Sequence, residues 1–160
     1  MAETTHSKRD TALVAGVVLP LAGVLGLGLA IGLGVFFVQR SNRLSFEAMH
    51  NDVLTSLEAI QQAQEAHLAR SGAFVACEDA TPRPLAQVGR ASRPWTGGAC
   101  WDELGWEPEG PSVRGTYWVE VQGDVFTVHG AIDADGDGVP ALFRATAGSP
   151  PVRTTPDGVY

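Results

Sequence analysis

The sequence is poor in basic residues, with 11 Lys and Arg against 18 Asp and Glu and a net charge of −7. Binding of nucleic acid through its phosphates needs a basic surface, so this balance excludes that class of partner. With 160 residues, the chain is also too short for a large multidomain enzyme. Its four histidines lack zinc-ligand spacing, and neither a G-x-S-x-G motif nor a P-loop is present. We therefore expect a protein that is not an enzyme and binds no nucleic acid.

Charged residues are missing altogether between residues 11 and 38. As a helix rising about 1.5 Å per residue, this run would measure about 42 Å, which exceeds the ~30 Å hydrocarbon core of a membrane. The run is also longer than the apolar stretch of about 7–15 residues found in a cleaved signal peptide. We therefore predict a short cytoplasmic segment over 1–10 and a single transmembrane helix over 11–38.

Cysteine is scarce too, because Cys77 and Cys100 are the only two, and both follow the apolar run. Two basic residues flank the run on each side, so the positive-inside rule does not fix its orientation. An even pair of cysteines in a small exported domain predicts a disulfide. We therefore predict that Cys77 and Cys100 are bridged and that the C-terminal domain is periplasmic or extracellular.

Glycine is frequent within the apolar run. Gly28 and Gly32 are four residues apart, the spacing at which transmembrane helices approach closely, although glycine is common in such helices in general. A face of small residues suits a helix that packs against copies of itself. The candidate helix-packing residues are Leu19, Val24, Leu27, Gly28, Gly32 and Phe36.

A second periodic pattern follows the apolar run. Its apolar residues recur at steps of three and four, which is typical of an amphipathic helix: Phe46, Met49, Val53, Leu57 and Ile60. Gly72 can take the left-handed conformation just past the last helical turn. Because no Pro or Gly intervenes between Val35 and Arg70, we predict an unbroken helix whose amphipathic continuation covers 39–72.

The rest of the chain, residues 73–160, has the composition of loops and strands. Residues 78–113 are rich in Pro, Gly, Arg and Ser and predict a long connecting loop. The segments with strand patterns are 115–122, 124–131 and 140–146, of which the first two meet at Gly123 as a hairpin. We expect the proline-containing C-terminal tail to be irregular. The predicted fold class is α+β, with a long N-terminal helix packed on a small antiparallel sheet.

This order of elements is similar to that of type IV pilins and pseudopilins, in which a disulfide-tied loop and an antiparallel sheet follow a long helix. Residues 59–74 resemble the pilin pattern of an alanine-rich helix end leading to a Gly and then an aromatic residue. The LGW-P-G segment within 101–110 and the D-x-D-G-D-G segment at 133–138 together resemble pilin-like proteins of the myxobacterial type. The resemblance covers residues 40–146 and implies a pilin-like fold.

Two features of that family are missing. Pilins carry a basic leader ending in Gly, and a Glu at the fifth position of the hydrophobic helix that pairs with a neighbouring subunit's terminal amine. Here Lys8-Arg9-Asp10 precedes the run, and no Glu or Asp lies within 11–38. The resemblance implies a structural protein anchored by a single span in the bacterial inner membrane, a minor subunit of a type IV pilus or type II secretion-like assembly. Its partners would be the membrane and, through the N-terminal helix, its own copies or other pilin-like subunits. The missing Glu favours the alternative of a stand-alone periplasmic binding or scaffold module that is anchored and does not polymerise.

Three aspartates, Asp133, Asp135 and Asp137, match the first half of a calcium-binding loop, in which carboxylates at positions 1, 3 and 5 precede a Gly. The twelfth position holds Arg144 instead of the usual bidentate Glu. Asp and Gly are equally typical of a tight turn between strands. The sequence thus leaves two interpretations, a calcium site and a turn.

Aromatic residues are concentrated in the second half of the chain. Trp101, Trp106, Tyr117 and Trp118 are candidates for a surface patch that binds a ligand. Aromatic residues in a small sheet domain more often pack in the core and its loops. Exposure in the folded chain separates these interpretations.

Overall fold

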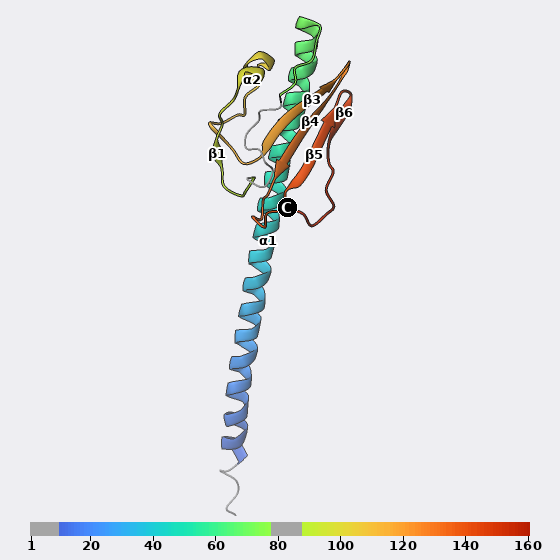
Figure 1. Ribbon diagram of the computed structural model, residues 1–160. Helices are drawn as coiled ribbons and strands as arrows, with labels where there is room; N and C mark the ends of the chain where they lie inside the picture. The colour runs from blue at the N-terminus through green and yellow to red at the C-terminus, as the bar shows by residue number, and fades with distance from the viewer. Residues whose placement is uncertain (1–9, 78–87) are drawn as a thin grey trace, which may run out of the picture. The chain divides into compact units, whose positions relative to one another are not determined.

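The computed structural model describes the backbone of residues 10–77 and 88–160, and the side chains of 35–38, 40–77 and 88–160. In chain order its elements are helix α1 (Asp10–Ser71), strand β1 (Arg93–Pro94), helix α2 (Ala99–Leu104) and strands β2 (Ser112–Val113), β3 (Thr116–Gln122), β4 (Val125–Ile132), β5 (Ala141–Thr146) and β6 (Ser149–Arg153) (Figure 1). The chain divides into two compact units, Met1–Leu44 and Ser45–Tyr160, and the second is called the folded unit below.

Helix α1 is continuous over 62 residues, as the absence of Pro and Gly between Val35 and Arg70 predicts for its second half. It ends at Ser71, and Gly72 follows with a φ of 79° and donates its N–H to the carbonyl of Leu68. That positive φ closes the last turn in the way that glycine permits. The predicted stop of the helix is confirmed.

A four-stranded antiparallel sheet in the order β3-β4-β5-β6 forms the centre of the folded unit. The three predicted strands are confirmed, and Gly123, with a φ of 63°, turns the chain between β3 and β4. The tail expected to be irregular contains the fourth strand, β6. Its Pro150 and Pro151 are compatible with a strand because β6 lies at the edge of the sheet, where a backbone N–H is not required for pairing.

The residues expected to form a long connecting loop also contain regular structure. The short strands β1 and β2 pair antiparallel, and α2 lies between them in the chain. Helix α2 ends at Gly105, which takes the left-handed conformation and donates its N–H to the carbonyl of Trp101. A six-residue helix is too short for an apolar period to appear in the sequence. Residues 78–87 of the predicted loop lie outside the described residues.

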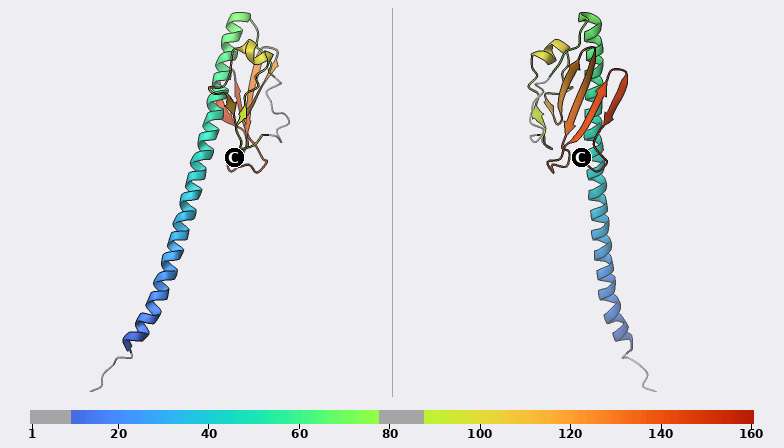
Figure 2. Two further views of the ribbon diagram at one scale, coloured as in Figure 1. Left: turned by 90° about the vertical axis from the view of Figure 1, so that its left-hand side faces the viewer. Right: turned by 45° about the vertical axis from the view of Figure 1, so that its right-hand side comes forward.

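The core of the folded unit lies between α1 and one face of the sheet, which both views of Figure 2 show side by side. Val53, Leu57 and Ile60 of the predicted apolar stripe are buried against strand residues that include Val119, Phe126, Val128 and Phe143. The predicted α+β fold, with the N-terminal helix packed on an antiparallel sheet, is therefore confirmed. Helix α1 approaches β4 closely at Gly130. A Cβ added to this glycine would lie 2.6 Å from Leu57 Cδ1 and 2.9 Å from Val53 Cγ1.

Candidate functional sites

Four consecutive apolar residues of helix α1, Val35 to Val38, form what we call the apolar collar. They are 52, 57, 64 and 61 % exposed, respectively. With about 3.6 residues per turn, four successive side chains point to all sides of a helix. Nothing in the described residues covers them. Exposed apolar surface of this kind marks contact with another protein or with lipid.

The collar contains one of the predicted helix-packing residues, Phe36, whose exposure leaves it available for such a contact. The side chains of Leu19, Val24 and Leu27, and the environment of Gly28 and Gly32, lie outside the described residues. Among the residues that the structure describes, no helix is both long and apolar enough to cross a membrane. The transmembrane helix over 11–38 extends into residues without described side chains and stays a prediction.

The acidic loop between β4 and β5 brings together the three aspartates that the sequence singles out. One carboxylate oxygen from each of Asp133, Asp135 and Asp137 lies within 4.8 Å of the others. Asp133 is buried and accepts hydrogen bonds from the backbone N–H groups of Gly136 at 2.7 Å and Gly138 at 3.0 Å. Gly136 and Gly138 have φ values of 79° and 86°, which a tight turn of this shape requires.

The other two carboxylates also accept backbone hydrogen bonds within the loop. Asp135 accepts from the N–H of Asp137 at 3.2 Å, and Asp137 accepts from the N–H of Val139 at 2.7 Å. These bonds satisfy the turn interpretation by themselves. Calcium binding stays a prediction, and a thermal melt with and without a chelator tests it: an unchanged midpoint would leave these residues as a turn.

The aromatic residues proposed as a surface patch do not form one. Trp101, Trp106 and Tyr117 are buried in the core of the folded unit. Trp101 and Trp106 have ring centroids 5.1 Å apart, and Trp95, which the sequence does not single out, packs edge-on against both. Trp118 lies apart from these rings and stacks on the His129 imidazole at 4.9 Å. These four side chains therefore form no continuous exposed patch, because a small sheet domain with few large apolar residues buries most of its aromatic rings in the core.

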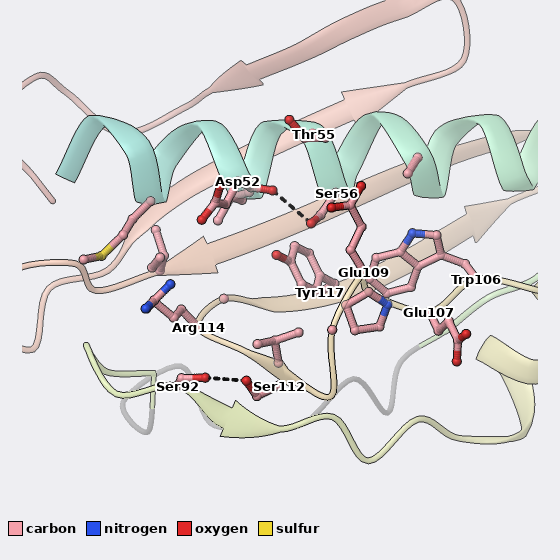
Figure 3. A pocket seen from close by; sticks show the side chains of 18 residues that line it. Asp52, Thr55, Ser56, Ser92, Trp106, Glu107, Glu109, Ser112, Arg114 and Tyr117 are labelled. Atoms are coloured by element: carbon pink, nitrogen blue, oxygen red, sulfur yellow. Dashed lines mark hydrogen bonds between the residues drawn. The ribbon is translucent and has the colours of Figure 1, made fainter. Parts of the chain in front are cut away.

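A groove in the folded unit lies between helix α1 and the segment 106–117 (Figure 3). Its volume is about 410 Å³, within the range of sites for small molecules. Trp106 and Tyr117 contribute apolar wall, with ring centroids 5.5 Å apart in an edge-to-face arrangement. The sequence offers no motif for this groove, because its two sides come from segments about fifty residues apart.

Tyr117 is the most strongly perturbed ionisable group of the groove. Burial raises the pKa of its phenol, and the charge of Asp52 raises this pKa further. A hydrogen bond with Ser56 and the charge of Arg93 act in the opposite direction without cancelling the effect of burial. The phenol therefore stays neutral at physiological pH and adds a polar but uncharged group to the wall of the groove.

The structure shows no bridge between Cys77 and Cys100, and the disulfide between them stays a prediction. Cys77 is buried and pairs through its backbone with Val119 of β3, with N···O distances of 3.0 and 2.9 Å. Cys100 lies half-buried in α2. Backbone pairing at the edge of β3, and the contacts described next, hold the segment after α1.

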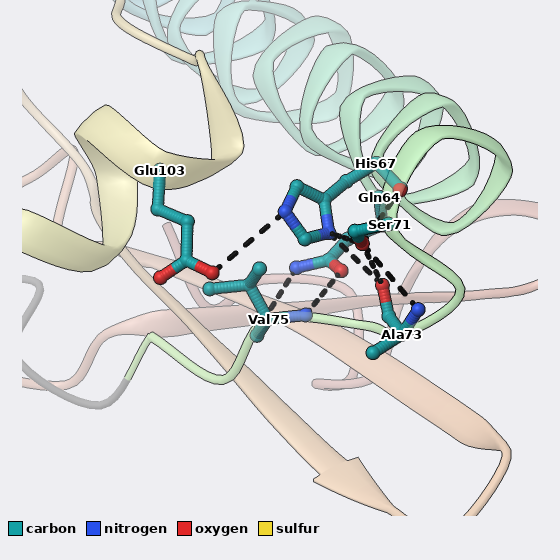
Figure 4. Close-up of polar contacts among 6 residues, drawn as sticks. All are labelled: Gln64, His67, Ser71, Ala73, Val75 and Glu103. Carbon is teal, nitrogen blue, oxygen red and sulfur yellow. Dashed lines mark hydrogen bonds and ion pairs between the residues drawn. The ribbon is translucent and has the colours of Figure 1, made fainter.

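The end of helix α1 is joined to the following segment by buried polar side chains that the sequence does not single out (Figure 4). The Gln64 amide is fully buried and pairs with Val75 in both directions, donating to its carbonyl at 2.6 Å and accepting from its N–H at 3.0 Å. His67 places Nδ1 2.9 Å from the carbonyl oxygen of Ala73 and Nε2 3.8 Å from a carboxylate oxygen of Glu103. Gln64 lies four residues after Ile60, on the continuation of the buried stripe, and this spacing is the only signal in the sequence that separates it from the neighbouring Gln61 and Gln62.

No family model, curated protein or solved structure matches this chain.

Proposed function

We propose that this chain is a membrane-anchored, pilin-like structural subunit that assembles through its N-terminal helix. In this proposal it is a minor component of a type IV pilus or of a type II secretion-like assembly, and the folded unit is exported to the periplasm or the cell exterior. The observation that carries the proposal is the apolar collar, because four apolar side chains exposed on all sides of a helix require a covering of lipid or of other helices.

The edges of the sheet support assembly through the helix in preference to assembly through strands. On β6, Pro150 and Pro151 offer no backbone N–H to an added strand. On the opposite edge, Val119 of β3 already exchanges both of its backbone hydrogen bonds with Cys77. A sheet with both edges modified in this way resists extension by another chain. Contacts between subunits are then left to the helix.

Photo-crosslinking in the native membrane tests the proposal. The full chain carries p-benzoylphenylalanine in place of Phe37, in the collar, or in place of Val125, an equally exposed apolar residue of β4. We expect the probe at position 37 to give a covalent adduct with a second copy or with another pilin-like subunit, mapped by mass spectrometry to that partner's N-terminal helix. The probe at position 125 is expected to give no such adduct.

Other results separate the alternatives. Adducts with lipid alone at position 37 would favour the stand-alone anchored module, which the missing Glu of the apolar run also favours. A chain that stays in the soluble fraction after cell lysis would contradict the membrane anchor itself. Mass spectrometry of the purified protein adds an independent readout, because a trimmed and methylated N-terminus indicates pilin processing whereas an intact Met1 indicates the module.

A further inference from the structure

The lining of the groove described above has an excess of negative charge, and the one cation beside the lining, Arg93, acts on Tyr117 and donates to the carbonyl of Gly115. Asp52, Glu107 and Glu109 line it, against a single basic residue, Arg114. Within the described residues the only ion pairs are those of His67 with Glu103 and of His129 with Glu120. All four charged groups of the groove therefore lack a counter-charge within ion-pairing distance in the described part of the chain.

The residues that carry these carboxylates come from opposite walls of the groove. Asp52 projects from helix α1, whereas Glu109 reaches across from the facing segment and places its carboxylate near Ser56 (Figure 3). Glu107 points away from these two in the same view, and Arg114 lies at the other end of the groove. A ligand between Asp52 and Glu109 thus meets negative charge from two sides.

The wall of the groove suits a cation as well. The rings of Trp106 and Tyr117 are held in place by their edge-to-face contact, and both belong to the buried core. Aromatic rings attract cations through the negative potential of their faces. The neutral Tyr117 phenol and the Ser56 hydroxyl, which itself donates to the carbonyl of Asp52 at 2.9 Å, add polar atoms for orientation.

We propose that this groove binds an organic cation of the guanidinium or alkylammonium class, held between the carboxylates of Asp52 and Glu109 over the rings of Trp106 and Tyr117. A guanidinium group fits best, since it is planar, weakly hydrated, and able both to pair with carboxylates and to stack on an aromatic ring. A free amine and the basic side chain of a peptide share this chemistry. The proposal is independent of the assembly role, because every residue named here lies in the folded unit.

Calorimetric titration of the full chain, in a non-denaturing detergent, tests the proposal with agmatine as the probe. We expect Asp52→Asn and Glu109→Gln each to weaken binding about fivefold, the effect of losing one charge interaction worth about 1 kcal/mol near the surface. Arg114→Gln is expected to tighten binding, because it removes the only positive charge of the lining. Glu58→Gln, on an exposed position of α1 outside the groove, is the matched control and should leave affinity unchanged.

Two further probes sharpen the result. Butylurea has the shape of an alkylguanidine without its charge and should not bind, whereas binding equal to that of agmatine would overturn the proposal. A blocked Gly-Arg-Gly peptide distinguishes the two sources of the cation, because binding of the peptide indicates a partner's side chain and binding of agmatine alone indicates a free amine. No binding of either cation, or equal loss of affinity in Asp52→Asn and Glu58→Gln, would also overturn it. Melting temperatures of the variants, which change only exposed side chains, verify that each is folded.

Discussion

Helix α1 contains two stretches whose apolar side chains differ in their exposure to solvent. In the folded unit, Leu57 and Ile60 of α1 are completely buried against the sheet. In the collar, Phe36 and Phe37 are more than half exposed, and Leu44, which follows it, is 58 % exposed. Both stretches are helical and both are rich in apolar residues, so local conformation does not distinguish them.

This difference in exposure depends on whether another part of the same chain can cover the apolar surface of each stretch. The amphipathic stretch carries one apolar stripe, which a four-stranded sheet of the same chain is wide enough to cover. Around the collar the apolar residues follow one another without a polar face. A helix that is apolar on all sides is covered only when it is surrounded, as in a bundle or a membrane. The first stretch therefore contributes to the stability of the chain, whereas the second stays exposed in the described residues, as the proposed assembly requires.

Truncation of one apolar residue in each stretch tests this contrast most strongly. Leu57→Ala leaves a cavity in the core and should lower the free energy of unfolding by about 2–5 kcal/mol. Phe37→Ala should change it by less than about 0.5 kcal/mol, because the side chain is 64 % exposed. Denaturant unfolding monitored by tryptophan fluorescence reports on the folded unit, which contains all four indoles. Comparable losses in the two variants would show that the collar is part of the same cooperative core.

Loss of the polar contacts at the end of α1 is expected to have the next largest effect on the free energy of unfolding. Gln64→Ala leaves the N–H and carbonyl of Val75 buried without their partner, at a cost of about 1–3 kcal/mol in the free energy of unfolding. Gln62→Ala, on the exposed face two residues away, is the control and should be nearly neutral. Hydrogen exchange at the Val75 amide provides a local readout, which should accelerate in the first variant alone. Unchanged exchange in Gln64→Ala would contradict the role assigned to the amide.

Gly130 tests how closely the amphipathic stretch packs. Gly130→Ala adds a Cβ within 2.6–2.9 Å of Leu57 and Val53, so the helix or the strand must shift, with an expected loss of about 1–3 kcal/mol. Gly89→Ala is the matched control, because nothing lies within 4 Å of its added Cβ and its φ is not positive. Thermal unfolding of both variants measures the difference. Equal midpoints would mean that the helix can move away from β4 without loss of packing.

The parts of this fold that the sequence predicts are those with a local period. The recurrence of Val53, Leu57 and Ile60 at helical spacing indicates the buried face of α1, and alternation indicates β3, β4 and β5. Strand β6 has no such signal because two of its five residues are prolines. Its position at the edge of the sheet, which permits them, is known only from the tertiary structure.

The candidate sites also differ in whether the sequence predicts them, because some lie within one segment and others form between distant segments. The acidic loop is predictable because Asp133, Asp135 and Asp137 are neighbours in sequence, and the structure brings their oxygens together. The groove between Asp52 and Glu109 depends on packing between distant segments, so no window of sequence indicates it. For the cysteines, counting predicts a disulfide, whereas the contacts of Cys77 depend on its register opposite Val119. Long-range register is the information that a single sequence lacks.

The C-terminal tail provides the last test, at the point where the folded unit begins along α1. Tyr160 packs against Phe46 at 5.2 Å and stacks on His50 at 5.6 Å between ring centroids. Arg153 holds the tail by donating to the carbonyls of Pro156 and Val159, and its guanidinium lies 5.7 Å from the Tyr160 ring. Nε2 of His50 is buried and has no hydrogen-bond partner among the described residues. Protonation of His50 would therefore place a charge on a ring whose Nε2 has no hydrogen-bond acceptor among the described residues.

Burial lowers the pKa of His50 below its ordinary value of 6.5, the charge of Arg153 lowers it further, and Glu47 opposes both. Because the folded chain binds this proton less readily than the unfolded chain, the stability contribution is complete above about pH 6.5 and is lost as the pH falls toward the folded-state pKa. We expect the free energy of unfolding to decline between pH 7.5 and 5.5, and to decline less in His50→Gln, whose side chain does not titrate. Denaturant unfolding across this range measures both slopes, and NMR titration of the His50 ring should give a pKa below 6.5. If the slopes are equal, the packing of the tail on His50 does not depend on the neutral form of this histidine.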